Sequence, residues 1–597
     1  MTTAQAQGSG SKRGYNFFLL VVAGLAGLLY GMDIGLIGSA LPYLQATSQL
    51  TASQTSVIVA TVLLGAVFST LFAGLLADWM GRKPLMNLCG VIFILSIPTI
   101  ALSHGYLPLF YGRLLEGISA GLIGVVVPLY LAECLAANER GKGAAVFQWL
   151  PVSSMVFAAL LGIYFSYRVE AVAKAGDAAA LFAYKDSAWR DLFWIALPPG
   201  ILFLIGSLMV SESPRWLFKR GKKEQAFAAL LRSRSEEQAK LEMAEMEEAE
   251  GKVSKVSSTG EKVKDSLFKR RYVVPFLLAC VILFCNTATG INSVIGYYTS
   301  ILLQSGLSDL YAHWGYVIFT SMNFLFTIVG MTLVDRKGRK FLLVIGTSLI
   351  IVAMVATGLL FKGTEKFSID ASHQIQPLVG ADNQLTLRFD RDLAGKLLAG
   401  AGEGGKRIDA GRASMAIIYS YGDYTAATSF VRSDDAAARP IEITRDSCVP
   451  SNPIIAFFNN PLGNLEAAKT APLHIERAQL GQVPESGNGW KVALCLFVFM
   501  AGFAMGPGVC VWLALSELMP TRIRSNGMSI ALVINQVVST ALSGIFFPFV
   551  SKHGYSSMFF MFAGFTVVYF IVAAFFLPET KGKTLEQIEA LFAGGEK

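Results

Sequence analysis

Charge is scarce in this chain. Only 15% of its 597 residues are Asp, Glu, Lys or Arg, compared with ~25% in a typical soluble protein, whereas 53% are hydrophobic and the mean hydropathy is +0.51. So few charged residues cannot supply the polar surface of the several soluble domains that a chain of this length would form. The composition therefore excludes a soluble protein and predicts one that crosses a lipid bilayer many times.

Motifs for catalysis and for metal binding are also missing. The 7 Cys contain no CxxC pair, which excludes a disulfide framework and a zinc spacing, and the 5 His lie outside the middles of the long apolar runs. No P-loop, GxSxG or HExxH motif occurs. We therefore expect no enzyme, no metal and no cofactor. The chain also has no N-x-[ST] sequon, which fits a bacterial inner membrane.

Twelve apolar runs are each long enough to cross a bilayer as a helix, the first near 17–44 and the last near 555–577. They show no strand-like alternation, which argues against a barrel. Lys and Arg gather in alternate links, while the short links 45–55, 105–106 and 303–312 carry none, so the positive-inside rule places both termini in the cytoplasm. This asymmetry accounts for the net charge of +8, and we expect no nucleic-acid partner.

The chain repeats itself once. GLLADWMGRK at 74–83 returns as GMTLVDRKGRK at 330–340, and AECLAANERGKG at 132–143 returns as SELMPTRIRSNG at 516–527. These pairs occupy equivalent places after the apolar runs of each half. The predicted fold is an all-α membrane protein with twelve transmembrane helices in two pseudo-symmetric six-helix halves.

The repeat also exposes an insertion. Asp78 and Glu133 are 55 residues apart, but their counterparts Asp335 and Glu517 are 182 apart, and the excess is polar with alternating segments. We expect a small β-rich domain on the outer side. Three interpretations of the insertion stay open: a disordered loop, a lid and a partner-binding module. The expected organisation begins with the first half at 1–217 and a cytoplasmic helical linker at 218–271. The second half starts at 272–361, is interrupted by the insertion at 362–489 and continues at 490–577, and a cytoplasmic tail follows at 578–597. The linker is either a solvated helix or a short bundle that couples the halves.

Several independent motifs follow one another in the order of a known family: DWMGRK, GRLLEGISAG, PLYLAE, ERGKG, SESPRWL, VDRKGRK and PETKGKT. In these motifs the chain resembles the sugar porter family of the major facilitator superfamily. The resemblance covers all twelve runs and excludes the insertion. It implies a transporter that works by alternating access, in which the two halves rock around a midplane site.

The resemblance implies that charges at the cytoplasmic ends of the helices form a gate when the inner side is closed. They occur as two matching sets, namely Asp78, Arg82, Glu133, Arg140 and Glu212, and Asp335, Arg339, Glu517, Arg524 and Glu579. The alternative is surface charge that only sets the topology, where each exposed pair contributes ~0–1 kcal/mol.

Charges inside the apolar runs are costly, about 2.5–3.5 kcal/mol each at the centre, and so indicate function. Asp33 lies deep in run 1, and Arg113 and Glu116 lie in run 4. The resemblance implies that Asp33 and Arg113 pair, and that protonation of Asp33 releases Arg113. A static ion pair is the alternative. Glu116 is either a second partner of Arg113 or a residue at a wet helix end. Glycines spaced by four flank these charges at Gly27, Gly31 and Gly35 and at Gly117 and Gly121, which predicts close packing of helices 1 and 4.

Amide side chains suit a sugar because each donates and accepts hydrogen bonds, and an indole ring suits its C–H face. The family's substrate site corresponds here to Gln148, Asn286, Thr287, Asn292, Asn323, Trp512, Asn535 and Gln536. At least three positions depart from the family pattern, because Asn286–Thr287 replaces a pair of Gln, Met155 replaces a Gln, and Gln536 replaces an aromatic residue. An ordinary glucose or xylose pocket is therefore doubtful, and a pentose, polyol, deoxy-sugar, sugar acid or non-sugar solute remains open.

The leading hypothesis is a proton-coupled symporter for a sugar-like solute, acting as a monomer in the bilayer. The alternatives are a facilitative carrier of a sugar or polyol, in which Asp33 is only structural, and a nutrient sensor on the same fold.

Overall fold

The computed structural model describes residues 3–135, 140–259, 269–435, 438–453, 456, 460–520, 523–581, 587–588 and 592. Within these residues, twelve helical segments are long and apolar enough to cross a membrane. The predicted all-α architecture of twelve spans is confirmed.

The first half contains spans 1 to 6, and its last span is broken where Pro198 and Pro199 begin a new helix. These helices are α1 (Thr3–Thr47), α2 (Ala52–Met80), α3 (Arg82–Ala101), α4 (Tyr106–Cys134), α5 (Arg140–Lys174), α6 (Ala178–Trp194) and α7 (Leu197–Met209).

The second half contains spans 7 to 12 and is interrupted twice. Gly290, at a φ of 84°, separates the two helices of span 7, and Gly506–Pro507 separates those of span 10. The helices are α11 (Arg270–Ala288), α12 (Ile291–Gln304), α13 (Asp309–Lys337), α14 (Arg339–Glu365), α19 (Ser486–Met505), α20 (Pro507–Leu518), α21 (Arg524–Gly544) and α22 (Phe546–Ile571), followed by a π turn at Val572–Phe576.

Glycines bring helices together, but not the pair that their spacing suggested. Gly31 on α1 lies against Pro151 and Ser154 of α5, and Gly117 on α4 lies against the backbone of Val62 on α2. The prediction that these glycines join spans 1 and 4 is wrong. The spacing reveals a smooth helix face but not which neighbour covers it.

We expect Gly117→Ala to destabilise the protein by about 1–3 kcal/mol, because the new methyl group would meet the rigid carbonyl of Val62. Gly124→Ala, two turns further along α4, is the matched control, since its methyl group would lie 3.7 Å from Tyr30. Thermal unfolding of both variants in detergent tests this. Equal melting temperatures would show that the α2–α4 contact has room for a methyl group.

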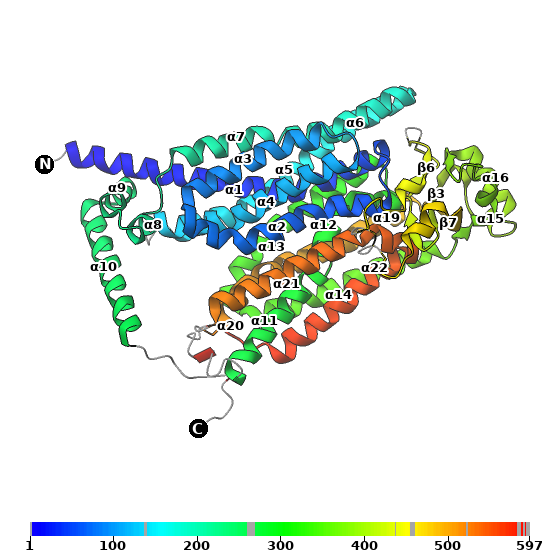
Figure 1. Ribbon diagram of the computed structural model, residues 1–597. Helices are drawn as coiled ribbons and strands as arrows, with labels where there is room; N and C mark the ends of the chain where they lie inside the picture. The colour runs from blue at the N-terminus through cyan, green and yellow to red at the C-terminus, as the bar shows by residue number, and fades with distance from the viewer. Residues whose placement is uncertain are drawn as a thin grey trace.

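The two halves touch mainly at one end of the bundle. Figure 1 shows that they lie side by side near the insertion, here called the insertion end, and diverge toward the end at which the chain begins and ends, here called the termini end. At the insertion end, Tyr43 donates to the Asp309 carboxylate at 2.9 Å and Ser166 donates to it at 2.5 Å. Tyr316 donates to the Gly35 carbonyl at 3.0 Å.

The insertion is a folded, β-rich unit between Glu365 and Ser486, as the sequence predicted. Its longest strands pair antiparallel at the centre of one sheet of order β1-β7-β3-β4, with β5 paired to β3, and β2 pairs with β6. Its elements are β1 (Ile369–Asp370), α15 (Ser372–Ile375), β2 (Leu385–Leu387), α16 (Arg391–Gly400), β3 (Ala413–Tyr421), β4 (Tyr424–Ala427), β5 (Val431–Arg432), β6 (Ile441–Ile443), α18 (Leu465–Thr470) and β7 (Leu473–Gln482). It has an apolar core of its own. The expected boundaries 362 and 489 fall inside α14 and α19, because both helices extend past their apolar segments.

The linker after span 6 forms a small bundle of α8 (Pro214–Lys219), α9 (Lys223–Ser233) and α10 (Glu236–Thr259). Leu217, Phe218 and Ala226 form its centre. Buried Arg234 holds it to the first half by donating to the Cys134 carbonyl at 2.9 Å, while its Nε donates to Glu242 at 2.5 Å. The structure therefore shows a small bundle in which α8 and α9 pack against the first half at the termini end, while α10 extends from α9 toward the second half (Figure 1).

Candidate functional site

Three charged side chains are buried together inside the first half. Asp33 on α1 and Arg113 on α4 are each 1% exposed, and Glu116 on α4 is 0% exposed. Arg113 forms an ion pair with Glu116 one turn away on the same helix, and its guanidinium lies 5.5 Å from the ring centre of Phe193 on α6. The expectation of a wet helix end for Glu116 is therefore wrong.

The resemblance implied a pair between Asp33 and Arg113, but in this conformation Arg113 pairs with Glu116. The reason is local, because side chains three residues apart on a helix are neighbours, whereas Asp33 lies on another helix. Both carboxylate oxygens of Asp33 are buried and accept no hydrogen bond from an N–H or hydroxyl group among the described residues, and the Asp33 carboxyl group lies within hydrogen-bonding range of the Glu116 carboxyl group. Asp33 nevertheless interacts electrostatically with both Glu116 and Arg113. Two carboxylates thus share one cation.

The polar residues expected to bind substrate in spans 7 and 11 lie together, and most of them form hydrogen bonds between the helices of these spans. Asn535 donates to the Leu283 carbonyl at 2.9 Å, and Thr287 donates to the Asn535 carbonyl at 3.2 Å. Asn292 donates to Ser539 at 2.6 Å. These bonds fasten α11 and α12 to α21. The Oδ1 atom of buried Asn286, in the same group, has no hydrogen-bond partner in the described part of the chain.

The other expected substrate residues are dispersed. Asn323 on α13 faces α5 of the first half, where its amide lies 3.9 Å from the Met155 sulfur. Trp512 on α20 is 45% exposed, and Gln536 is half-buried on α21. The side chain of Gln148 lies outside the described residues, as do those of Arg140 and Arg524 in the expected gate.

Trp149 is a site candidate that sequence reasoning missed. It lies next to Gln148, and its ring nitrogen donates to the Met331 sulfur of the second half at 3.2 Å. Its ring also meets that of Phe324 edge-on at 6.2 Å. A Trp at the start of an apolar run usually marks a membrane interface, and this common role hides its contact between the halves.

The expected gate charges form one cluster in each half at the termini end. Arg82 donates from Nε and Nη2 to the two oxygens of Glu133, both at 2.9 Å, and from Nη1 to Asp78 at 3.0 Å. In the second half, Arg339 lies 3.0 Å from Glu517 and 3.8 Å from Asp335.

A second carboxylate in each cluster caps a helix. Glu212 accepts hydrogen bonds from the backbone N–H groups of Arg82 and Lys83 at the start of α3, and Glu579 does the same for Arg339 and Lys340 at the start of α14. The capped helices follow Gly81 and Gly338, at φ of 101° and 91°, where a side chain would collide with the capping carboxylate. Burial raises the pKa of Glu212. The two clusters repeat one local structure, and each links helices of its own half.

The comparisons with known proteins agree with this architecture. The family described as "Sugar (and other) transporter" matches residues 19–377 and 476–592. The chain is 25% identical over 601 residues to the galactose-proton symporter of Escherichia coli strain K12, covering 100% of this chain and 98% of that protein. It is 25% identical over 582 residues to the proton myo-inositol cotransporter of Homo sapiens, covering 96% of this chain and 82% of that protein.

Solved structures have the same fold. The inward open conformation of the xylose transporter XylE from E. coli matches with a TM-score of 0.61 at 21% identity, covering 96% of this chain and 99% of that one. The MFS proton:xylose symporter XylE bound to 6-bromo-6-deoxy-D-glucose matches with a TM-score of 0.58 at 21% identity, covering 97% and 100%. The chain therefore belongs to the family described as "Sugar (and other) transporter", and it is an integral membrane transporter rather than an enzyme.

Proposed function

We propose that this protein is a proton-coupled symporter that carries one sugar-like solute by alternating access. Secondary active transport of a sugar or sugar-like solute follows from the family. The observation that carries proton coupling is the buried cluster of Asp33, Arg113 and Glu116, in which one cation faces two carboxylates.

In this cluster Arg113 is paired with Glu116, so a proton on Asp33 can neutralise the carboxylate that has no cation of its own. A buried carboxylate without a partner is unfavourable, and protonation removes its charge. With Arg113 held by Glu116, Asp33 is the group that exchanges a proton. When Asp33 is ionised it competes for Arg113, which rearranges α1 against α4. Protonation of Asp33 thus selects between two arrangements of the first half. In one arrangement the solute site opens to one side of the membrane, and in the other it opens to the opposite side.

The polar residues of spans 7, 8, 10 and 11 form the proposed solute site, together with Gln148 of span 5. Its short Asn286–Thr287 step and its internally bonded Asn535 offer fewer free amides than a hexose site built on a pair of Gln. This favours a solute that needs fewer hydrogen bonds, such as a pentose or a deoxy-sugar.

We place the termini end in the cytoplasm, because the basic clusters around Arg82 and Arg339 lie there, and we place the insertion outside a bacterial inner membrane. One chain supplies both halves, so the working unit is a monomer. The divergence of the halves at the termini end then corresponds to an inward-facing conformation (Figure 1).

Uptake into proteoliposomes tests the proposal. Labelled pentoses, hexoses, polyols and sugar acids are each offered with and without an inward proton gradient. One proton driven by 100 mV supplies about 2.3 kcal/mol. This corresponds to roughly 50-fold accumulation of an uncharged solute. Equilibration that ignores the gradient would identify a facilitative carrier instead.

A further inference from the structure

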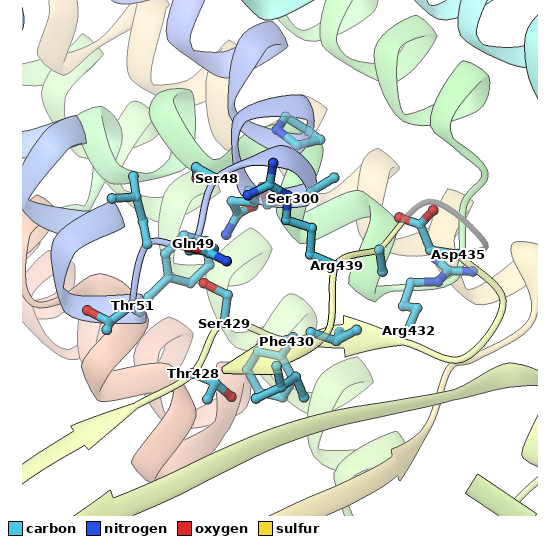
Figure 2. Close-up of a pocket in the computed structure, with 18 of the residues that line it drawn as sticks. Ser48, Gln49, Thr51, Ser300, Thr428, Ser429, Phe430, Arg432, Asp435 and Arg439 are labelled. Carbon is cyan, nitrogen blue, oxygen red and sulfur yellow. Dashed lines mark hydrogen bonds between the residues drawn. The ribbon is translucent and has the colours of Figure 1, made fainter. Parts of the chain in front are cut away.

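A pocket of about 180 Å³ lies at the insertion end, away from the proposed transport site (Figure 2). Its floor is formed by the tips of α1, α12 and α22, including Gln45, Ser300 and Tyr555. Its roof is formed by the insertion, including Ser429 and Phe430. The family match stops at residue 377 and resumes at 476, so the roof lies outside the part of the chain that the family shares.

The lining is rich in uncharged hydrogen-bonding groups. Amides and hydroxyls face the pocket at Gln45, Ser48, Gln49, Ser300, Gln304 and Ser429. The Ser429 hydroxyl is buried and has no hydrogen-bond partner among the described residues. Gln45 accepts from Ser300 at 3.0 Å through its carbonyl oxygen, which leaves its NH₂ group for a ligand. Phe430 and Tyr555 add two aromatic rings whose centres are 5.9 Å apart.

Most charges around the pocket are already matched within the protein. Lys185 of α6 lies 2.9 Å from Asp435, Arg432 lies 2.6 Å from Asp434, and Gln49 donates to Glu442 at 2.8 Å. The Arg439 guanidinium lies 4.6 Å from the ring centre of Phe182. The groups left for a ligand are therefore mainly neutral donors, acceptors and aromatic faces, beside the Arg439 guanidinium. This combination suits a polyhydroxylated, uncharged molecule.

The size agrees with a monosaccharide. A cavity needs about 10–15 Å³ to hold one water molecule. The pocket volume of about 180 Å³ therefore has room for about a dozen waters, or for a small solute that replaces them.

We propose that this pocket is a second, peripheral binding site for a neutral sugar or polyol, separate from the transport site. The proposal takes its solute class from the proposed function. Because the pocket is built from both halves and the insertion, a bound solute stabilises the conformation in which the halves meet at the insertion end. Occupancy from the outside therefore holds the carrier in this conformation and slows its return.

Site-directed labelling of the full-length protein in detergent tests the site without any flux. In Gln49→Cys, at an exposed position that lines the pocket, the rate of alkylation by a polar maleimide is measured with D-glucose, D-galactose, D-xylose or myo-inositol. Six of the seven native cysteines are buried and the seventh is half-buried, and the unsubstituted protein gives the background rate. At a solute concentration ten times the dissociation constant, alkylation should fall about tenfold.

Two controls separate occupancy from a change of shape. Thr386→Cys, on the exposed side of β2 and outside the pocket, should keep its rate. Adding Gln45→Ala to Gln49→Cys should raise the solute concentration needed for half protection, because it removes the free NH₂ group of Gln45. Protection by none of the four solutes, equal slowing at both cysteines, or protection unaffected by Gln45→Ala would each overturn the site. Protection without any transport would refute symport alone.

Discussion

Asp33→Asn is expected to abolish accumulation against a gradient while leaving exchange of solute across the membrane. At 100 mV the native protein should accumulate its solute about 50-fold, and the variant should reach only equal concentrations on the two sides. The physical reason is that an amide has the shape of the protonated carboxyl but can neither release nor take up the coupling proton.

Proteoliposome uptake and counterflow measure the two quantities separately. Asp392→Asn, on the exposed start of α16 in the insertion, is the matched control and should behave as the native protein. Accumulation that survives in Asp33→Asn would remove Asp33 from the coupling step and leave the buried cluster as a structural feature.

Glu116→Gln is expected to change the proton concentration at which transport works. In the native protein Arg113 is held by Glu116 on the same helix. Without that charge, Arg113 is free to pair with Asp33, and a proton must then displace a cation. An opposite charge nearby typically changes the required proton concentration by about ten- to a thousandfold. Uptake near neutral pH should therefore fall, and it should recover as the external medium is acidified.

The measurement is the initial rate of uptake against external pH at a fixed membrane potential. Glu170→Gln, at the partly exposed far end of α5, controls for the loss of a negative charge near the membrane. An unchanged pH profile in Glu116→Gln would show that Glu116 does not compete with Asp33 for Arg113.

Much of the fold follows from the sequence because its signals are local. An apolar run long enough to cross the bilayer has few alternatives to a helix, and the paired motifs around Arg82 and Arg339 predict two matching halves. The motifs SESPRWL and PETKGKT mark Glu212 and Glu579 as gate charges, but only the structure shows that they cap α3 and α14. Even the β-rich insertion is visible in its alternating segments.

Partners across the bundle could not be predicted in the same way. The sequence shows that Arg113 needs a carboxylate but not which of two carboxylates is nearer in a given conformation. It shows that Gly31 and Gly117 leave room for another helix to approach closely, but not that these helices are α5 and α2. The amides of Asn292 and Asn535 illustrate the same limit, because only the packed structure reveals that helix-to-helix bonds already use them.

The pairing of β1 with β7 has a consequence for how the insertion is attached. Ile369 lies opposite Leu480, so the chain enters and leaves the insertion on adjacent antiparallel strands. Because its two connections run side by side and its core is its own, the unit is a module that can be cut out and replaced by a tight turn. The spans on either side of the insertion, α14 and α19, pack directly against each other, so they do not depend on this unit to bring them together.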